Sequence, residues 1–166
     1  GDRRSAEASL KYVIYGGVAS GVMLYGLSLL YGMAGATDFG SVREAGVQAG
    51  VEPALFLGVA FSLAGFGYKI ASVPFHMWCP DVYEGAPTPV TAFLSVGPKA
   101  AGFALLMRFF AGAVPAEALL PDAPWPLVMG VLAAATMTLG NLAALHQTSL
   151  KRLLAYSSIA HAGYLL

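Results

Sequence analysis

The fold class follows from two stretches, PALFLGVAFSLAGFGYKIASV (53–73) and PVTAFLSVGPKAAGFALLMRFF (89–110). Each is a long apolar run with one lysine set inside it, Lys69 in the first and Lys99 in the second. An apolar run of about 20 residues crosses the hydrocarbon core of a bilayer as a helix. A charged side chain at that depth costs about 2.5–3.5 kcal/mol on insertion scales and usually serves an ion or proton path. The two stretches therefore predict membrane-spanning helices that carry buried, titratable groups.

The composition agrees with a membrane protein. Hydrophobic residues make up 57% of the 166 residues and charged residues only 11%, about half the charged share of a soluble domain. The formal net charge is zero, which gives no reason to expect a nucleic-acid partner. Cys79 is the single cysteine, so the sequence excludes a disulfide or a cysteine metal cluster within the chain.

Each apolar run is expected to be a helix, because lipid offers no hydrogen-bond partner to the backbone. The expected helices cover residues 12–31, 53–78 with a break near Pro74, 89–110, 127–145 and 150–166, the last cut short where the sequence ends. Connections with turn residues lie at 32–50, 80–89, 114–126 and 146–149. The chain is thus predicted to be an all-α, multi-pass integral membrane bundle. Residues 1–166 form a single transmembrane region, read as a fragment of a longer subunit.

Basic residues predict the orientation of the bundle. If every run crosses the membrane, one side holds Arg3, Arg4, Lys11, Lys151 and Arg152, and the other side holds Arg43 and Arg108. This bias places the first side in the cytoplasm. Arg152 is then an interfacial anchor and Lys151 guards an entrance. Asp81 and Glu84 could form a carboxylate pair, but we expect them to be solvated loop carboxylates.

A polar stripe runs along the second segment when it is drawn as a continuous helix. At spacings of 3, 4, 3 and 4 the stripe contains Ser62, Gly65, Lys69, Ser72 and His76. Such a stripe faces a water cavity or the bundle interior. The alternative is a helix-packing seam of small residues, with Lys69 reaching toward the interface.

Pro74 favours a polar path for ions or protons over a helix-packing seam. A proline inside a helix leaves the carbonyl four residues earlier without its donor, here Ile70. If the helix resumed through His76, the whole element would be one broken span with Lys69 beside the break. Broken helices at membrane depth are tolerated where they are buried or line a cavity. His76 fits a proton relay and a buried structural histidine equally well.

Lys99 has the same arrangement. Pro98 precedes it and leaves the carbonyl of Leu94 without a donor, and Ser95 shares its helical face. Lysine suits a proton path because burial makes its ammonium easier to deprotonate. The alternative is a lysine paired with an acidic residue from outside this sequence. Two lysines on neighbouring helices would repel when both are charged, so one proton could help to expel the other.

The last segment adds a further stripe, at spacings of 3, 4 and 3, made of Lys151, Leu154, Ser158 and His161. His161 titrates near neutral pH and could relay protons, although a structural histidine is almost as well supported. The sequence contains no GxxxxGK[ST], no GxGxxG that opens a helix and no HExxH. No catalytic, cofactor-binding or metal-binding residue is therefore expected in this chain.

Two runs carry a family resemblance, KIASVPFHMWCPDVYEGAPTPVTAFLSVGPKAAGFALLMR and GNLAALHQTSLKRLLAYSSIAHAGYLL. The chain resembles the antiporter-like family of membrane subunits. This family includes subunits L, M and N of bacterial respiratory NADH:quinone oxidoreductase (complex I) and subunits of Mrp-type cation/proton antiporters. Lysine at position 99 favours subunit N over subunit L, which typically carries histidine there.

The resemblance implies a fold of about fourteen helices in two inverted repeats, of which this chain supplies most of the first. It implies that Lys69 and Lys99 translocate protons as the broken-helix lysine and the central lysine. The glutamate that pairs with the broken-helix lysine would lie on a helix absent from this sequence. NADH, flavin, iron–sulfur clusters and quinone would bind to partner subunits, and the chain would lie in the bacterial inner membrane among other membrane-arm subunits. The alternative that remains open is a cation/proton antiporter subunit.

Overall fold

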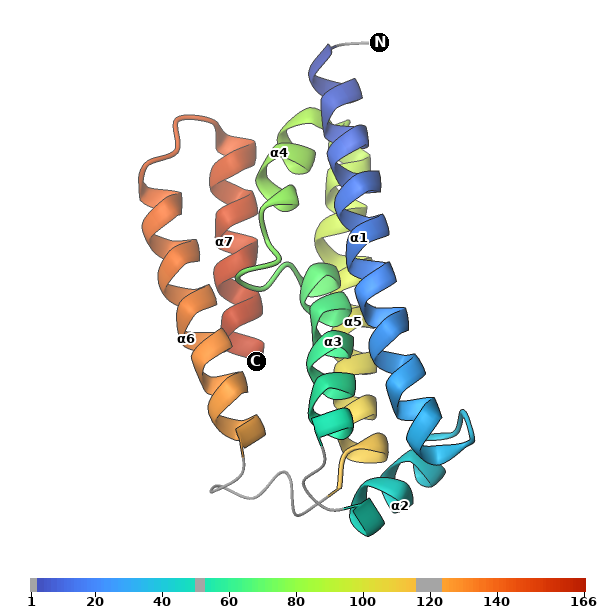
Figure 1. Ribbon diagram of the computed structural model, residues 1–166. Coiled ribbons are helices and arrows are strands. Elements are labelled where there is room, and N and C mark those ends of the chain that lie inside the picture. Colours follow the sequence, from blue (N-terminus) through green and yellow to red (C-terminus); the bar gives the residue numbers. More distant parts are fainter. Residues whose placement is uncertain (1–2, 50–52, 116–123) are drawn as a thin grey trace.

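The computed structural model describes residues 3–49, 53–115 and 124–166, and every regular element in them is an α-helix (Figure 1). The helices are α1 (Arg3–Ala34), α2 (Phe39–Ala49), α3 (Pro53–Ile70), α4 (Trp78–Gly85), α5 (Thr88–Ala113), α6 (Pro124–Leu145) and α7 (Leu150–Leu165). Within the described residues, four helices are long and apolar enough to cross a membrane: Arg3–Ala34, Pro53–Ile70, Thr88–Ala113 and Trp125–Leu145. The predicted class, an all-α membrane bundle, is confirmed.

The helices form two groups with α4 between them. α1, α3 and α5 pack together, and α6 and α7 form a hairpin beside them (Figure 1). Gly26 brings α1 close to α3, because a Cβ at this position would lie 2.7 Å from the carbonyl oxygen of Gly58. The core of the first group contains Val59, Ile70 and Phe109, each at most 1% exposed. This packing fixes the two lysine-bearing helices, α3 and α5, against each other.

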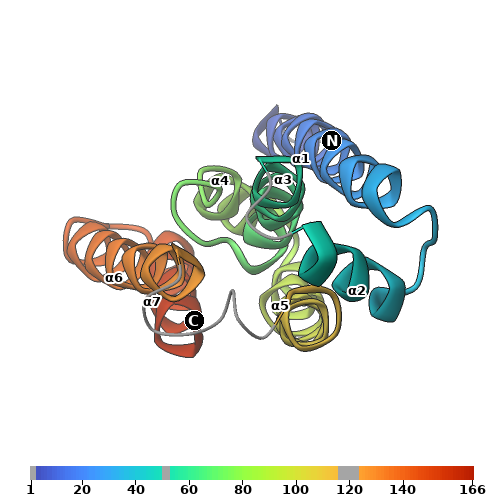
Figure 2. The same cartoon turned by 60° about the horizontal axis from the view of Figure 1, so that its bottom comes forward.

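The predicted connection at 32–50 was wrong in part, because it contains α2. Asp38 caps this helix: its carboxylate accepts the Ser41 N–H at 2.9 Å and the Ser41 hydroxyl at 2.7 Å. These bonds, that of the Ser41 N–H first, hold the pKa of the Asp38 carboxyl below its usual range. α2 lies across one end of the bundle near α5 (Figure 2), where Phe39 packs edge-on against Phe109.

The predicted connection at 80–89 was also wrong in part, because Trp78–Gly85 is helix α4. Pro80 suggested a loop, but it occupies the first turn of α4, where the missing N–H has no partner to lose. The face of α4 that carries Trp78, Cys79, Val82 and Tyr83 is buried. The polar start of α1 is also helical, because it packs on α4. There the Ser5 hydroxyl donates to the Gly85 carbonyl at 2.7 Å.

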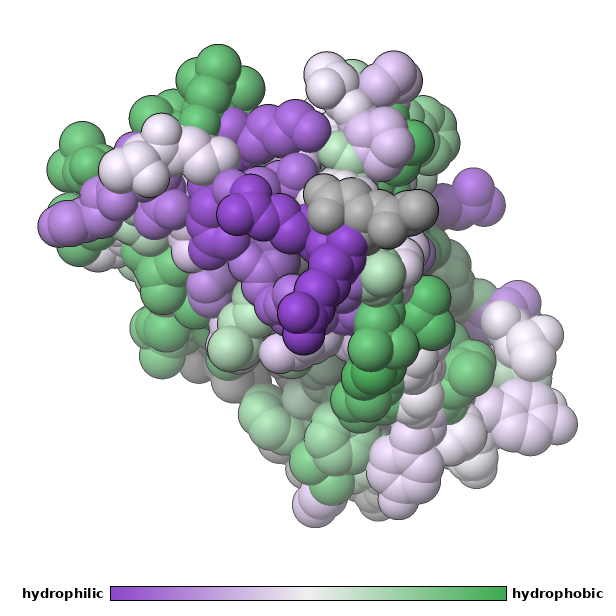
Figure 3. All heavy atoms as spheres, turned by 90° about the horizontal axis from the view of Figure 1, so that it is seen from above, coloured by the Kyte–Doolittle hydropathy of each residue, from purple (hydrophilic) through white to green (hydrophobic). Residues whose placement is uncertain are grey.

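One end of the bundle, called here the charged end, carries the predicted basic group. The start of α1, helix α4 and the α6–α7 connection lie at one end, and α2 lies at the other (Figure 1). The predicted five-residue basic group therefore shares one end. Seen from above, hydrophilic side chains gather in the middle of that end (Figure 3). The assignment of this end to the cytoplasm stays a prediction.

Candidate proton-path site

The break beside Lys69 begins at Ala71. Ala71 has φ of 59°, its N–H donates to the carbonyl of Tyr68 at 3.2 Å, and the N–H of Ser72 donates to the carbonyl of Gly67 at 2.9 Å. This pair of bonds is a Schellman cap, which closes a helix C-terminus. The predicted break near Pro74 is therefore present, and it begins three residues before the proline. α3 ends at Ile70 before the proline acts, residues 71–77 are not α-helical, and helix resumes at Trp78.

Neighbouring helices supply hydrogen-bond partners to the break. The N–H of Val73 donates to Oγ1 of Thr136 on α6 at 3.0 Å, and the indole N–H of Trp78 donates to the carbonyl of Tyr68 at 3.1 Å. Thr136 is fully buried. Sequence reasoning missed this residue, because one threonine in an apolar helix gives no sign of a partner 63 residues earlier.

Lys69 lies in the last turn of α3, where the helix dipole favours a positive charge. Its Nζ lies 5.9 Å from the centroid of the Tyr68 ring. The side chain is exposed, and no hydrogen bond or ion pair to it occurs among the described residues. Lys69 is therefore open to a partner from outside this stretch of sequence.

The stripe predicted around Lys69 is not a continuous helical face, because the helix ends at Ile70. Ser62 and Ser72 are both buried, and their hydroxyls bond to the carbonyls of Gly58, at 2.7 Å, and Gly67, at 3.5 Å. His76 lies in the break, where its buried Nδ1 has no hydrogen-bond partner in the described structure. None of these three polar residues forms a hydrogen bond with Lys69 in the described structure.

Lys99 is buried, with 7% of its surface exposed. Its Nζ donates to the hydroxyl oxygen of Ser158 at 2.6 Å and to the Ser158 carbonyl at 3.0 Å. The described partner of Lys99 is thus a neutral residue of α7 that sequence spacing could not pair with it. Two predicted site residues, 59 positions apart, are brought into direct contact.

Lys69 and Lys99 lie on helices in close contact. A Cβ at Gly102, three residues after Lys99 on α5, would lie 3.3 Å from Cβ of Lys69 and 2.8 Å from a methyl of Ile70. Gly102 therefore allows α5 to approach the end of α3 closely. This contact places the two lysine-bearing segments side by side.

Two half-open cavities extend along α5 and α7. One, of about 240 Å³, is lined by Lys99, and the other, of about 420 Å³, reaches Lys151 near the charged end. Both are lined by Ser95, Ser158 and His161. The four residues of the last predicted stripe, Lys151, Leu154, Ser158 and His161, all line the larger cavity.

The two outer members of this stripe also contact the backbone. Lys151 Nζ donates to the carbonyl of Ala86 at 2.9 Å, and Nδ1 of the exposed His161 lies 2.8 Å from the carbonyl oxygen of Ser157. Polar groups therefore follow the cavities from one end of the bundle to Lys99.

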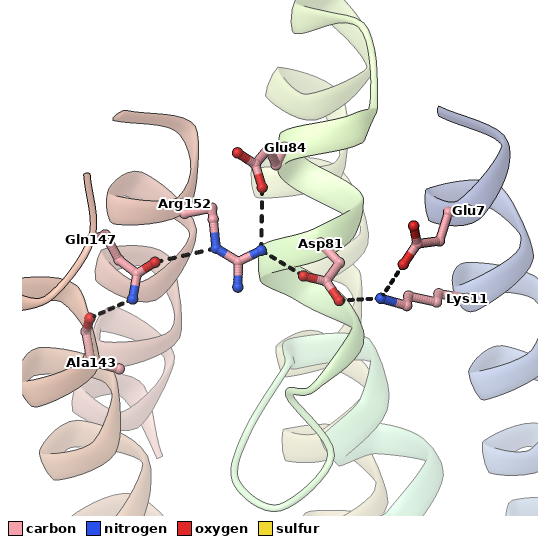
Figure 4. Close-up of polar contacts among 7 residues, drawn as sticks. All are labelled: Glu7, Lys11, Asp81, Glu84, Ala143, Gln147 and Arg152. Carbon is pink, nitrogen blue, oxygen red and sulfur yellow. Dashed lines mark hydrogen bonds and ion pairs between the residues drawn. The ribbon is translucent and has the colours of Figure 1, made fainter. Parts of the chain in front are cut away.

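An ion-pair cluster at the charged end corrects three expectations (Figure 4). Asp81 on α4 accepts from Lys11 of α1 and from Arg152 of α7, each at 2.6 Å. Lys11 also pairs with Glu7 at 2.8 Å, and Arg152 with Glu84 at 3.2 Å. Asp81 and Glu84 are thus not solvated loop carboxylates, and Arg152 is more than an interfacial anchor. The expectation was wrong because DVYEG was placed in a loop. The spacing of three residues between Asp81 and Glu84 puts two side chains on a common face only in a helix.

Comparison with known proteins decides the family. Residues 1–166 match the family described as NADH:quinone oxidoreductase/Mrp antiporter, transmembrane. The chain belongs to this family.

Its relatives in the NADH:quinone oxidoreductase/Mrp family are longer than this chain. NADH-quinone oxidoreductase subunit N of Anaeromyxobacter sp. (strain Fw109-5) is 60% identical, over 100% of this chain and 35% of the relative. NADH-quinone oxidoreductase subunit N 2 of Sorangium cellulosum (strain So ce56) is 61% identical, over 99% of this chain and 34% of the relative. The chain spans about a third of the length of these relatives.

Solved structures share the fold. Respiratory complex I from Thermus thermophilus with bound aureothin matches with a TM-score of 0.80 and 43% identity, over 98% of this chain and 34% of that one. The Mrp complex from Dietzia sp. DQ12-45-1b matches with a TM-score of 0.87 and 24% identity, over 99% and 29%, which supports the fold alone. In the described part of this family member, no three His, Cys, Asp or Glu side chains are placed to hold a metal ion.

Proposed function

We propose that this chain is part of subunit N of a bacterial NADH:quinone oxidoreductase and translocates protons through Lys69 and Lys99. Relatives with 60 and 61% identity bear the name of that subunit. The observation that carries the proposal is Lys99, a buried lysine held by a serine beside cavities that lead to the charged end. Residues that only packed helices together would not need this arrangement.

The chemistry rests on the two protonation states of lysine. A charged ammonium has three N–H donors, and the two oxygens of Ser158 accept from that of Lys99. A lysine side chain can also release its proton, which an arginine does not. Protonation of Lys69 on the adjoining helix would promote that release by repulsion. Ser95, His161 and Lys151 line the route by which the proton reaches or leaves Lys99, and Pro74, His76, Ser62 and Ser72 belong to the broken span around Lys69.

In this function the chain lies in the bacterial inner membrane among the other membrane-arm subunits. It holds no redox centre of its own. NADH, flavin, iron–sulfur clusters and quinone bind to partner subunits, and the energy of electron transfer reaches the lysines through the contacts between subunits.

The proposal predicts the effect of Lys69→Ala and Lys99→Ala in the full-length subunit within the assembled complex. Each change should lower proton translocation driven by NADH oxidation by about tenfold or more, because a proton-holding group is lost. Arg108→Ala is the matched control, since it removes an exposed cation from the same helix as Lys99. Acidification of inverted membrane vesicles measures the effect. Normal acidification by both lysine variants would refute the proposal.

A cation/proton antiporter subunit of the Mrp type is the second candidate, because the family description includes Mrp antiporters. The relatives with 60 and 61% identity are named as subunit N of the oxidoreductase, so the oxidoreductase is preferred. A sodium or potassium gradient imposed on vesicles without NADH distinguishes the two. Lysine-dependent proton movement driven by the gradient alone would favour the antiporter.

A further inference from the structure

Pro98 leaves one backbone carbonyl of α5 without its helical donor, and Tyr83 supplies a donor to that carbonyl. Proline has no N–H, so the carbonyl of Leu94, four residues earlier in α5, lacks its helical donor. The hydroxyl of Tyr83 donates to this carbonyl at 3.1 Å. Tyr83 comes from α4, so the missing bond of one helix is supplied by another.

The ring of Tyr83 also contacts Lys99. The Lys99 Nζ lies 5.9 Å from the ring centroid, within the range in which an aromatic face stabilises a cation. Tyr83 is 2% exposed, and its own carbonyl accepts from the hydroxyl of Thr91 at 3.1 Å. The ring has little freedom to move unless α4 moves with it.

α4 is connected to several parts of the bundle. It directly follows the break at 71–77, and Asp81 ties it to α1 through Lys11 and to α7 through Arg152 (Figure 4). A displacement of α4 relative to α5 would change both contacts of Tyr83, the bond to Leu94 and the ring contact with Lys99. Tyr83 is therefore a side chain that links α4, which follows the break, to the buried lysine.

We propose that Tyr83 is a positioning residue for Lys99. Its hydroxyl supplies the hydrogen bond that Pro98 removes from α5 at the carbonyl of Leu94, and its ring supports the ammonium while Ser158 accepts the hydrogen bonds. Movement of the α3–α4 break thereby alters the setting in which Lys99 holds its proton. This inference rests on the proposed function of Lys99.

The test uses Tyr83→Phe, which keeps the ring and removes the hydroxyl, in the assembled complex with the full-length subunit. The number of protons translocated per NADH oxidised should fall about two- to tenfold at equal amounts of complex. Tyr25→Phe, on the exposed face of α1, is the matched control and should leave the ratio unchanged. This ratio separates positioning from folding, because a complex that fails to assemble loses electron transfer and proton transfer together.

A double-mutant cycle with Pro98→Ala sharpens the test. Alanine restores an N–H to residue 98 that can bond to the carbonyl of Leu94, so Tyr83→Phe should have a smaller effect in the Pro98→Ala background. An equal effect in both backgrounds, or an unchanged ratio in Tyr83→Phe, would overturn the inference. If Tyr83→Phe fails to assemble with and without Pro98→Ala, the role of the tyrosine is folding alone and the inference is wrong.

Lys99→Ala measured beside these variants tells the two proposals apart. If Lys99→Ala leaves the ratio unchanged, the proposed function itself fails. If Lys99→Ala lowers the ratio and Tyr83→Phe does not, only the role of Tyr83 is lost.

Discussion

Ala71 ends α3 in the left-handed region of backbone conformation, which disfavours a residue with a Cβ by about 1–2 kcal/mol. The cost is offset by the two hydrogen bonds of the Schellman cap and by complete burial of the alanine methyl. The cap matters for function because it ends the helix next to Lys69, two residues before Ala71. The C-terminal end of α3, which carries the negative end of the helix dipole, is thereby placed at Lys69.

Ala71→Gly should therefore change stability by less than about 0.5 kcal/mol, although it removes a fully buried methyl group. Relief of the left-handed conformation offsets the lost burial of about 0.8 kcal/mol and the greater freedom of glycine in the unfolded chain. Ala155→Gly is the matched control, because Ala155 is equally buried but lies within α7. It should cost about 1.5–2 kcal/mol. Heat-inactivation midpoints of the purified complex measure both, and equal losses would contradict this account of the break.

Among the elements, α6 holds the break in place. Thr136 donates to the carbonyl of Leu132 at 2.6 Å and accepts from the N–H of Val73. Thr138 makes the same kind of bond within α6, to Ala134 at 2.7 Å, but its side chain is exposed. The two threonines thus differ chiefly in the contact with the break.

Thr136→Val should destabilise the complex by about 1–3 kcal/mol, because the N–H of Val73 would be left without an acceptor. Thr138→Val should have little effect. The difference between their heat-inactivation midpoints isolates the contribution of the break. A similar small shift in both variants would show that α6 does not anchor it.

The elements also show what the sequence could predict. The long spans follow from apolar length, which the bilayer enforces. Helices α2 and α4 could not be predicted in this way. A short segment next to Gly or Pro has the composition of a turn, and only its buried face shows that it is a helix. Pro74 predicted the position of the break, but it could not predict that α3 ends at Ile70, because the cap at Ala71 depends on an uncommon alanine conformation. Pro98 did leave Leu94 without a donor as expected, but the Tyr83 donor comes from a helix that had been read as a loop.

In the whole molecule, the contact that matters most joins distant parts of the chain. Lys99 and Ser158 meet because the α6–α7 hairpin folds back beside α5 and α4 (Figure 1). Each residue was singled out from its local pattern, but no local pattern pairs them. Both cavities adjoin this contact, and the larger one reaches Lys151 near the charged end, so the route that we propose for protons is organised around Lys99.

The claim that these lysines act by releasing protons, and not merely by carrying charge, is tested most directly with Lys69→Arg. Arginine keeps the positive charge at the end of α3 but does not deprotonate. The measurement is the number of protons translocated per NADH oxidised by the assembled complex. We expect Lys69→Arg to lower this ratio as much as Lys69→Ala does. A normal ratio in Lys69→Arg together with a low ratio in Lys69→Ala would contradict the claim, because a fixed charge would then suffice.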